Sequence, residues 1–128
     1  MSSDIASRVV EAINQKDYSA IERLTSPEVQ LRLPPGQVFF GHEGVHAFIS
    51  ELERVLPELT VIARRQWTGM GFSVVEFESA GRSARNDPSE SLGAIVLELN
   101  GEQIRRIQVY LDTAQWDELH KQASERQT

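Results

Sequence analysis

Apolar residues recur at helical spacing in the first half of the chain. Ile5, Val9 and Ile13 lie four residues apart, which predicts an amphipathic helix that stops near residue 14. The longest such pattern begins at Gly41 and predicts a helix that Pro57 closes. Its apolar positions, at intervals of three, four and seven residues, are Val45, Phe48, Ile49, Leu52, Val55 and Leu56.

A shorter helix is predicted between these two, followed by a strand. Residues 18–24 form the helix, with Ser19 and Glu22 at the spacing of a capping box. Ser26 and Pro27 end it, because proline disfavours helical geometry in the residue before it. Residues 29–33 then alternate between apolar and polar side chains, the pattern of a half-buried strand.

The second half of the chain alternates in the manner of strands and ends in a helix. Strands are predicted over 59–70, 72–80, 92–99 and 103–111, with Asn100 and Gly101 at a hairpin turn. Residues 81–91 are polar and without periodicity, which predicts a mobile loop. A last helix is expected over 113–122, with fraying beyond it. Helices gathered before a run of strands indicate an α+β fold.

The length, charge and composition of the chain exclude several classes of protein. A chain of 128 residues is one domain, spanning 1–128 with an ordered core of about residues 4–122. Its net charge of −6 argues against nucleic-acid binding, and no apolar run reaches the 18 residues that indicate a membrane span. Without cysteine it has neither disulfides nor thiolate metal sites. No signal peptide is apparent at the start, so a cytoplasmic protein is expected.

Three segments of the sequence resemble those of a known protein family. They are AINQKDYSAIERL (Ala12–Leu24), LPPGQVFFGHEGVHAF (Leu33–Phe48) and NGEQIRRIQVYLDTAQWDEL (Asn100–Leu119). In this order they resemble the SnoaL-like, polyketide cyclase-like branch of the nuclear transport factor 2-like superfamily. The resemblance implies a cone-shaped α+β domain with a curved, mostly antiparallel sheet, an internal apolar pocket and a homodimer formed through the sheet. It does not imply one reaction, because this fold hosts isomerases, cyclases, dehydratases and non-catalytic domains.

Asp112 is the candidate general base. By resemblance it occupies the acidic position of the family's Tyr-x-Asp ending, and a carboxylate in an apolar pocket can take a proton from an acidic C–H. Tyr110 and Tyr18 are the candidate hydrogen-bond donors. The alternative for Asp112 is structural, because Asp112 and Gln115 have the spacing of a capping box for the last helix. Strand alternation favours this cap, since it places Asp112 on the face opposite Val109.

Other family sites are disfavoured by the residues present. The positions that resemble the base, the tyrosine and the second acid of ketosteroid isomerases hold Leu33, Val9 and Ile95. His42 and His46 match the letters of the zinc motif H-E-x-x-H, but they stand at a helix start without a third ligand. Glu43 fits there as an acidic residue favoured by the helix dipole. We therefore expect neither a metal nor a cofactor.

The predicted ligand is small and largely apolar. Its expected contacts come from aromatic and leucine side chains: Phe40, Phe48, Leu52, Trp67 and Trp116. The predicted function is binding in an internal pocket, with cofactor-free acid/base chemistry of cyclase or isomerase type on a polyketide-like or cyclic carbonyl substrate. The alternative is a non-catalytic ligand-binding or dimerisation module of the same fold.

Overall fold

Four helices and six strands make up the chain in the computed structural model, which describes residues 5–34 and 36–126. The elements are α1 (Ile5–Gln15), α2 (Tyr18–Leu24), β1 (Thr25–Leu33), β2 (Gln37–Phe40), α3 (Gly41–Val55), β3 (Thr60–Gly69), β4 (Phe72–Arg82), β5 (Pro88–Asn100), β6 (Gln103–Leu111) and α4 (Thr113–Arg126). The predicted α+β class is confirmed.

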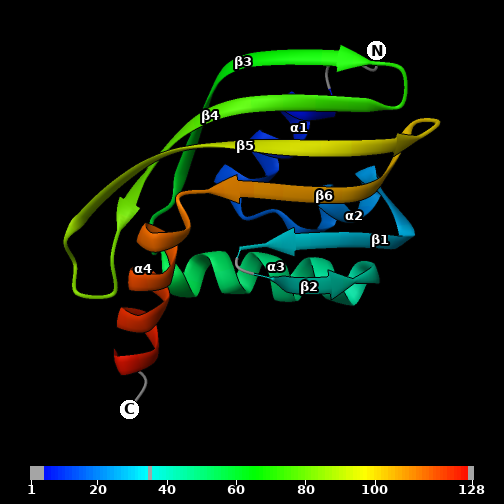
Figure 1. The fold of residues 1–128 in the computed structure, drawn as a ribbon. Helices are drawn as coiled ribbons and strands as arrows, with labels where there is room; N and C mark the ends of the chain where they lie inside the picture. Colours follow the sequence, from blue (N-terminus) through cyan, green and yellow to red (C-terminus); the bar gives the residue numbers. More distant parts are fainter. Residues whose placement is uncertain (1–4, 35, 127–128) are drawn as a thin grey trace.

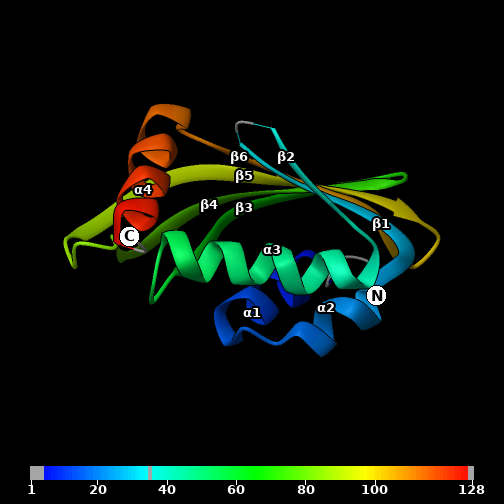
Figure 2. The ribbon, with the colours of Figure 1, turned by 90° about the horizontal axis from the view of Figure 1, so that it is seen from below.

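One curved sheet carries all the strands, in the order β2-β1-β6-β5-β4-β3 (Figure 1). Strands β3 to β6 form an antiparallel meander, and β1 pairs in parallel with β6 and antiparallel with β2. Helices α1, α2 and α3 lie against one face of the sheet, and α4 lies at one end of it (Figure 2). The covered face is called the inner face below, and the opposite face is the outer face.

Strand alternation decides which side chains of β6 reach the inner face. Ile107 and Val109 are buried, whereas Tyr110 between Val109 and Leu111 is exposed. This division confirms the alternation predicted for the strand, because successive side chains of a pleated strand point to opposite faces.

Several predicted boundaries were wrong. The hairpin loop expected over 81–91 is limited to residues 83–87, because β4 and β5 continue as a paired ribbon through Gly81↔Ser89 to Arg82↔Pro88. Backbone pairing needs no apolar side chains, so a polar composition did not prevent it. Helix α4 likewise runs past residue 122 to Arg126, with Ala123 buried against the core.

Two further differences concern local structure. The cap of α2 is Asp17, whose Oδ1 accepts the Ala20 N–H at 3.0 Å, and not Ser19. The short edge strand β2 was not predicted, because only four residues separate Gly36 from α3. In the sheet, β2 pairs with Gln30–Leu33 of β1 and directs the chain into α3.

Gly93 of β5 allows the Phe77 side chain and the Tyr110 backbone to lie close to the β5 backbone. A Cβ at this position would lie 2.6 Å from Cζ of Phe77 and would also collide with the carbonyl oxygen of Tyr110. A glycine is therefore required where β5 pairs with both Phe77 and Leu111.

Candidate ligand-binding site

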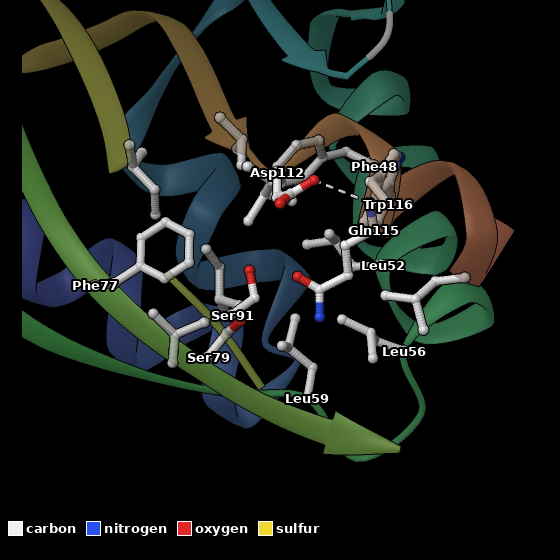
Figure 3. A pocket seen from close by; sticks show the side chains of 16 residues that line it. Phe48, Leu52, Leu56, Leu59, Phe77, Ser79, Ser91, Asp112, Gln115 and Trp116 are labelled. Atoms are coloured by element: carbon white, nitrogen blue, oxygen red, sulfur yellow. Dashed lines mark hydrogen bonds between the residues drawn. The ribbon is translucent and has the colours of Figure 1, made fainter. Parts of the chain in front are cut away.

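A small cavity lies between the inner face of the sheet, α1, α3 and α4. It is called the inner cavity below, and its volume is about 40 Å³. Its apolar lining residues are Ile13, Phe48, Leu52, Leu56, Leu59, Val61, Phe77, Ile95, Val109, Leu111, Trp116 and Leu119. Its remaining lining residues are Ser79, Ser91, Asp112 and Gln115 (Figure 3). The lining is thus apolar except for one polar cluster.

The polar cluster marks the place where the inner cavity meets a larger hollow on the surface. This outer depression has a volume of about 640 Å³ and shares with the inner cavity Ser79, Ser91, Asp112 and Gln115. The outer depression also touches Glu78 and Glu90. The four shared residues therefore form the mouth of the inner cavity.

The mouth exists because β5 is longer than its neighbour β6. Pairing between them ends at Gly93↔Leu111, whereas β5 begins at Pro88. Residues 88–92 pair with β4 on one side and face the start of α4 on the other. Gln115 crosses this gap, because its Nε2 donates to the carbonyl oxygen of Glu90 at 2.9 Å and to Ser89 Oγ at 3.3 Å.

Asp112 lies at the mouth as the cap of α4. Its Oδ1 accepts the backbone N–H of Gln115 at 3.0 Å, which satisfies one of the free donors at the helix start. The residue is exposed. The cap weighed in the sequence is therefore present, while the role of Asp112 as a general base stays a prediction.

The two serines of the mouth were not predicted as site residues. Ser79 and Ser91 face each other across β4 and β5 and both line the inner cavity. Ser91 lies in the segment that was expected to be a loop, so its pairing with Ser79 could not be foreseen. Phe77, two residues from Ser79, was considered only as one of many core aromatics. The available signal was the period-2 spacing of Val75, Phe77 and Ser79.

The structure brings three of the five predicted ligand contacts to the inner cavity. Phe48 and Leu52 approach from α3, and Trp116 approaches from α4. Trp116 is 2% exposed, and its Nε1 has no hydrogen-bond partner among the described residues.

Phe40 and Trp67 do not line the inner cavity. Phe40 pairs with Gln30 at the sheet edge and is 64% exposed, whereas its neighbour Phe39 turns inward against Phe48. Trp67 is 46% exposed, because a register shift between Ala63 and Arg65 sets it opposite Val74 on the outer face. The sequence pattern did not reveal either register.

Neither candidate tyrosine lines the inner cavity. Tyr110 is 55% exposed on the outer face, and Tyr18 stacks on His46 with the ring centroids 4.7 Å apart. His46 in turn pairs with Glu22, and His42 Nε2 lies 3.3 Å from the Thr25 carbonyl oxygen. Both histidines thus have local partners at the start of α3. Within residues 5–34 and 36–126, no three His, Cys, Asp or Glu side chains are grouped as metal ligands would be.

A polar network fastens α4 to α3 beside the inner cavity. Glu51 accepts hydrogen bonds from Arg54 Nε at 2.7 Å and from Gln37 Nε2 at 2.7 Å. His120 of α4 completes the network, with its Nε2 3.0 Å from Glu51 Oε2. Burial by itself would raise the pKa of the Glu51 carboxyl. These partners and the charge of Arg54 outweigh burial and lower the pKa from 4.5 to about 2.

The outer face carries ion pairs across the strands. Glu78 pairs with Arg64, and Glu76 pairs with Arg65. Glu98 pairs with both Arg105 and Arg106, and the hydrogen bond from Arg106 is the largest cause of its lowered pKa. These carboxylates therefore belong to the outer face and not to the inner cavity.

Comparison with known proteins gives the family. The sequence profile of the SnoaL-like domain matches residues 6–107. This chain belongs to the SnoaL-like domain family. It therefore belongs to the NTF2-like superfamily, as its three segments indicated, and that family's fold carries a ligand-binding pocket. A comparison with curated protein sequences finds no significant match.

Solved structures share the fold of this SnoaL-like domain at low sequence identity. A putative SnoaL-like polyketide cyclase from Jannaschia sp. CCS1 is 14% identical, with a TM-score of 0.81 over 89% of this chain and 87% of that one. TerC, co-crystallised with polyporic acid, is 17% identical, with a TM-score of 0.84 over 94% and 98%. An NTF2-like protein of unknown function from Burkholderia pseudomallei K96243 is 17% identical, with a TM-score of 0.85 over 92% and 95%. At these identities the likeness concerns the fold alone.

None of the helices in the described part is long and apolar enough to cross a membrane.

Proposed function

We propose that this SnoaL-like domain binds a small, uncharged and largely apolar molecule in the inner cavity. The observation that carries the proposal is the apolar lining with its polar groups gathered at one mouth. Such a site favours burial of apolar surface, while a few polar groups orient the ligand. The co-crystallised polyporic acid of TerC, on a similar fold, is consistent with a cavity that takes an organic molecule.

Binding must be accompanied by opening of the cavity. A volume of about 40 Å³ holds a few water molecules, whereas pockets for drug-sized ligands occupy about 300–1,000 Å³. Opening between β5 and α4 leaves the sheet intact, because no strands pair across this gap and Gln115 crosses it with two hydrogen bonds.

The test is a titration of toluene, followed by protein NMR and by the melting temperature. Toluene should raise the melting temperature and shift signals of residues that line the inner cavity. Leu52→Phe narrows the cavity and should weaken binding, whereas Met70→Phe, at an exposed turn, should not. Toluene and other small uncharged aromatic probes that all leave the protein unchanged would refute the proposal.

The second candidate function is acid/base chemistry with Asp112 as the base. It is favoured by one observation: Asp112 lies at the mouth, and its Oδ2 has no hydrogen-bond partner among the described residues. The test is deuterium incorporation at the α-carbon of cyclohexanone in D₂O. Asp112→Asn keeps the cap and should lower the rate about 10²–10⁴-fold if Asp112 is the base.

We also propose that two copies associate through the outer face. The outer face exposes large apolar side chains at Ile62, Trp67, Phe72, Leu92 and Tyr110. Exposed aromatic residues together with arginines are typical of protein interfaces. Arg106, Gln108 and Tyr110 of β6 have this mixed composition, which supports a second copy as the partner.

A further inference from the structure

Two residues that line the inner cavity carry a polar group without a hydrogen-bond partner among the described residues, Trp116 and Ser79. Ser79 is 6% exposed, and in the described part of the chain its hydroxyl makes no hydrogen bond. Because Ser79 also lines the outer depression, its hydroxyl can take a partner from water or from a ligand that enters through the mouth. Ser79 therefore offers a free donor and acceptor at the wall of the cavity.

Two polar side chains, those of Ser91 and Gln115, lie beside the Ser79 hydroxyl at the mouth. Ser91 stands opposite Ser79 across the strand pair, and within the described residues its hydroxyl makes one hydrogen bond, a long one of 3.4 Å to the Leu92 carbonyl oxygen. Figure 3 shows the hydroxyls of Ser79 and Ser91 close to each other, with the amide oxygen of Gln115 on their side of the mouth. The amide nitrogen of Gln115 is already engaged by Glu90.

The charges of the cavity lining restrict which ligand groups can bind beside Ser79 and Ser91. Asp112 is the only residue with an ionisable side chain among those that line the inner cavity, and no cation is among them. A ligand carboxylate would therefore lose its hydration without gaining an opposite charge, and it would lie near the Asp112 carboxylate. A neutral hydroxyl or carbonyl meets no such penalty.

We propose that Ser79 and Ser91 bind the single neutral polar group of the ligand, a hydroxyl or a carbonyl, while its apolar body occupies the rest of the inner cavity. This inference rests on the proposed binding function and names the class of ligand that the cavity selects. Ser79 supplies the free hydroxyl, and the hydroxyl oxygen of Ser91, which donates to the Leu92 carbonyl, adds an acceptor beside it. Carboxylates of the same size are rejected.

The test compares three probes of similar size: toluene, phenol and benzoate at pH 7. Their dissociation constants are measured by NMR titration with the wild type, Ser79→Ala and Ser91→Ala. Phenol should bind more tightly than toluene, and benzoate at least about tenfold more weakly than phenol. Ser79→Ala should weaken phenol about fivefold, the size of one neutral hydrogen bond, and leave toluene unchanged. Ser91→Ala should act in the same direction.

Ser73→Ala is the matched control. Ser73 is buried on the same face of β4, but its hydroxyl is bonded to Thr68 and the Trp67 carbonyl, away from the inner cavity. It should leave the preference for phenol over toluene unchanged. The proposal is overturned if toluene binds but phenol gains nothing over it, or if both serine variants weaken the two probes equally. Those results leave the binding function standing. Failure of all three probes refutes the binding function itself, and this inference with it.

Discussion

The side-chain amide of Gln115 donates a hydrogen bond to the carbonyl oxygen of Glu90 at 2.9 Å, which joins the first turn of α4 to the start of β5. This bond spans the only part of the β5 edge that β6 leaves unpaired, within the described residues. The bond crosses the mouth of the inner cavity, where no strand pairing joins β5 to α4. We therefore expect Gln115 to limit how freely solvent reaches Trp116.

Gln115→Ala should open the mouth at small cost to stability. The lost hydrogen bonds are partly exposed, so the free energy of unfolding should fall by less than about 1 kcal/mol. Acrylamide quenching measures the opening in a Trp67→Phe background, where Trp116 alone emits. Quenching should increase in Gln115→Ala. If Trp116 is quenched equally with and without Gln115, the mouth does not depend on this residue.

Asp112 should matter to stability as a helix cap. Asp112→Ala should lower the free energy of unfolding by about 1 kcal/mol, and Asp112→Asn should remain near the wild type, because asparagine caps nearly as well. Denaturant unfolding measures both. Asp117→Ala, on the exposed side of the same helix, is the control. An equal loss in Asn and Ala variants would show that charge, not capping, is what Asp112 contributes.

The Glu51 network should make stability depend on pH in the acid range. The pKa of Glu51 is about 2 in the folded protein against 4.5 as the ordinary value, so the unfolded chain binds the proton first as pH falls. The stabilisation is complete above about pH 5 and is lost between about pH 5 and pH 2, on the order of 3 kcal/mol. Acid unfolding curves measure this loss.

Glu51→Gln removes this titrating group. Its free energy of unfolding should be lower at neutral pH and should fall less steeply between about pH 5 and pH 2 than that of the wild type. Glu118→Gln, on the exposed side of α4, should keep the wild-type pH dependence. A Glu51→Gln variant with an unchanged slope would contradict the assignment.

Gly93 should not tolerate a side chain. In Gly93→Ala the new Cβ meets Phe77 and the backbone of Tyr110, and the crowding should cost about 1–3 kcal/mol of stability. Gly36→Ala is the matched control, because nothing lies within 4 Å of its Cβ. Thermal unfolding of the two variants distinguishes them, and equal stability would show that β5 can move away from Phe77.

The association through the outer face predicts a particle of about 29 kDa instead of 14.4 kDa in sedimentation at micromolar concentration. Tyr110→Glu should shift it to the smaller mass, because a charge replaces an exposed aromatic side chain of the proposed interface. Asp117→Lys, on α4, should leave the mass unchanged. A wild-type protein that sediments as a single copy would exclude the association.

The local patterns of the sequence predicted every element except β2, together with some local details. In β6, Ile107 and Val109 lie on the inner face and Tyr110 lies on the outer face. This follows from the sequence, because neighbouring side chains of a strand point to opposite faces. The cap at Asp112 follows in the same way from its spacing to Gln115, since a helix start leaves N–H donors that a residue three positions earlier can reach. Both depend only on residues close in the chain.

Pairing between distant segments was decided by the tertiary structure. Ser79 lies opposite Ser91 because β4 and β5 remain paired through a segment of polar residues. The backbone hydrogen bonds of such a pair do not depend on side-chain hydrophobicity, so the hydrophobic pattern does not predict them. Trp67 turns outward because of a register shift in β3, and one residue of shift reverses the face of every residue after it. The gap bridged by Gln115 arises from the unequal lengths of β5 and β6, which only their register reveals. The mouth of the inner cavity is made by these long-range pairings, so its residues could not be assigned until the strands were placed beside one another.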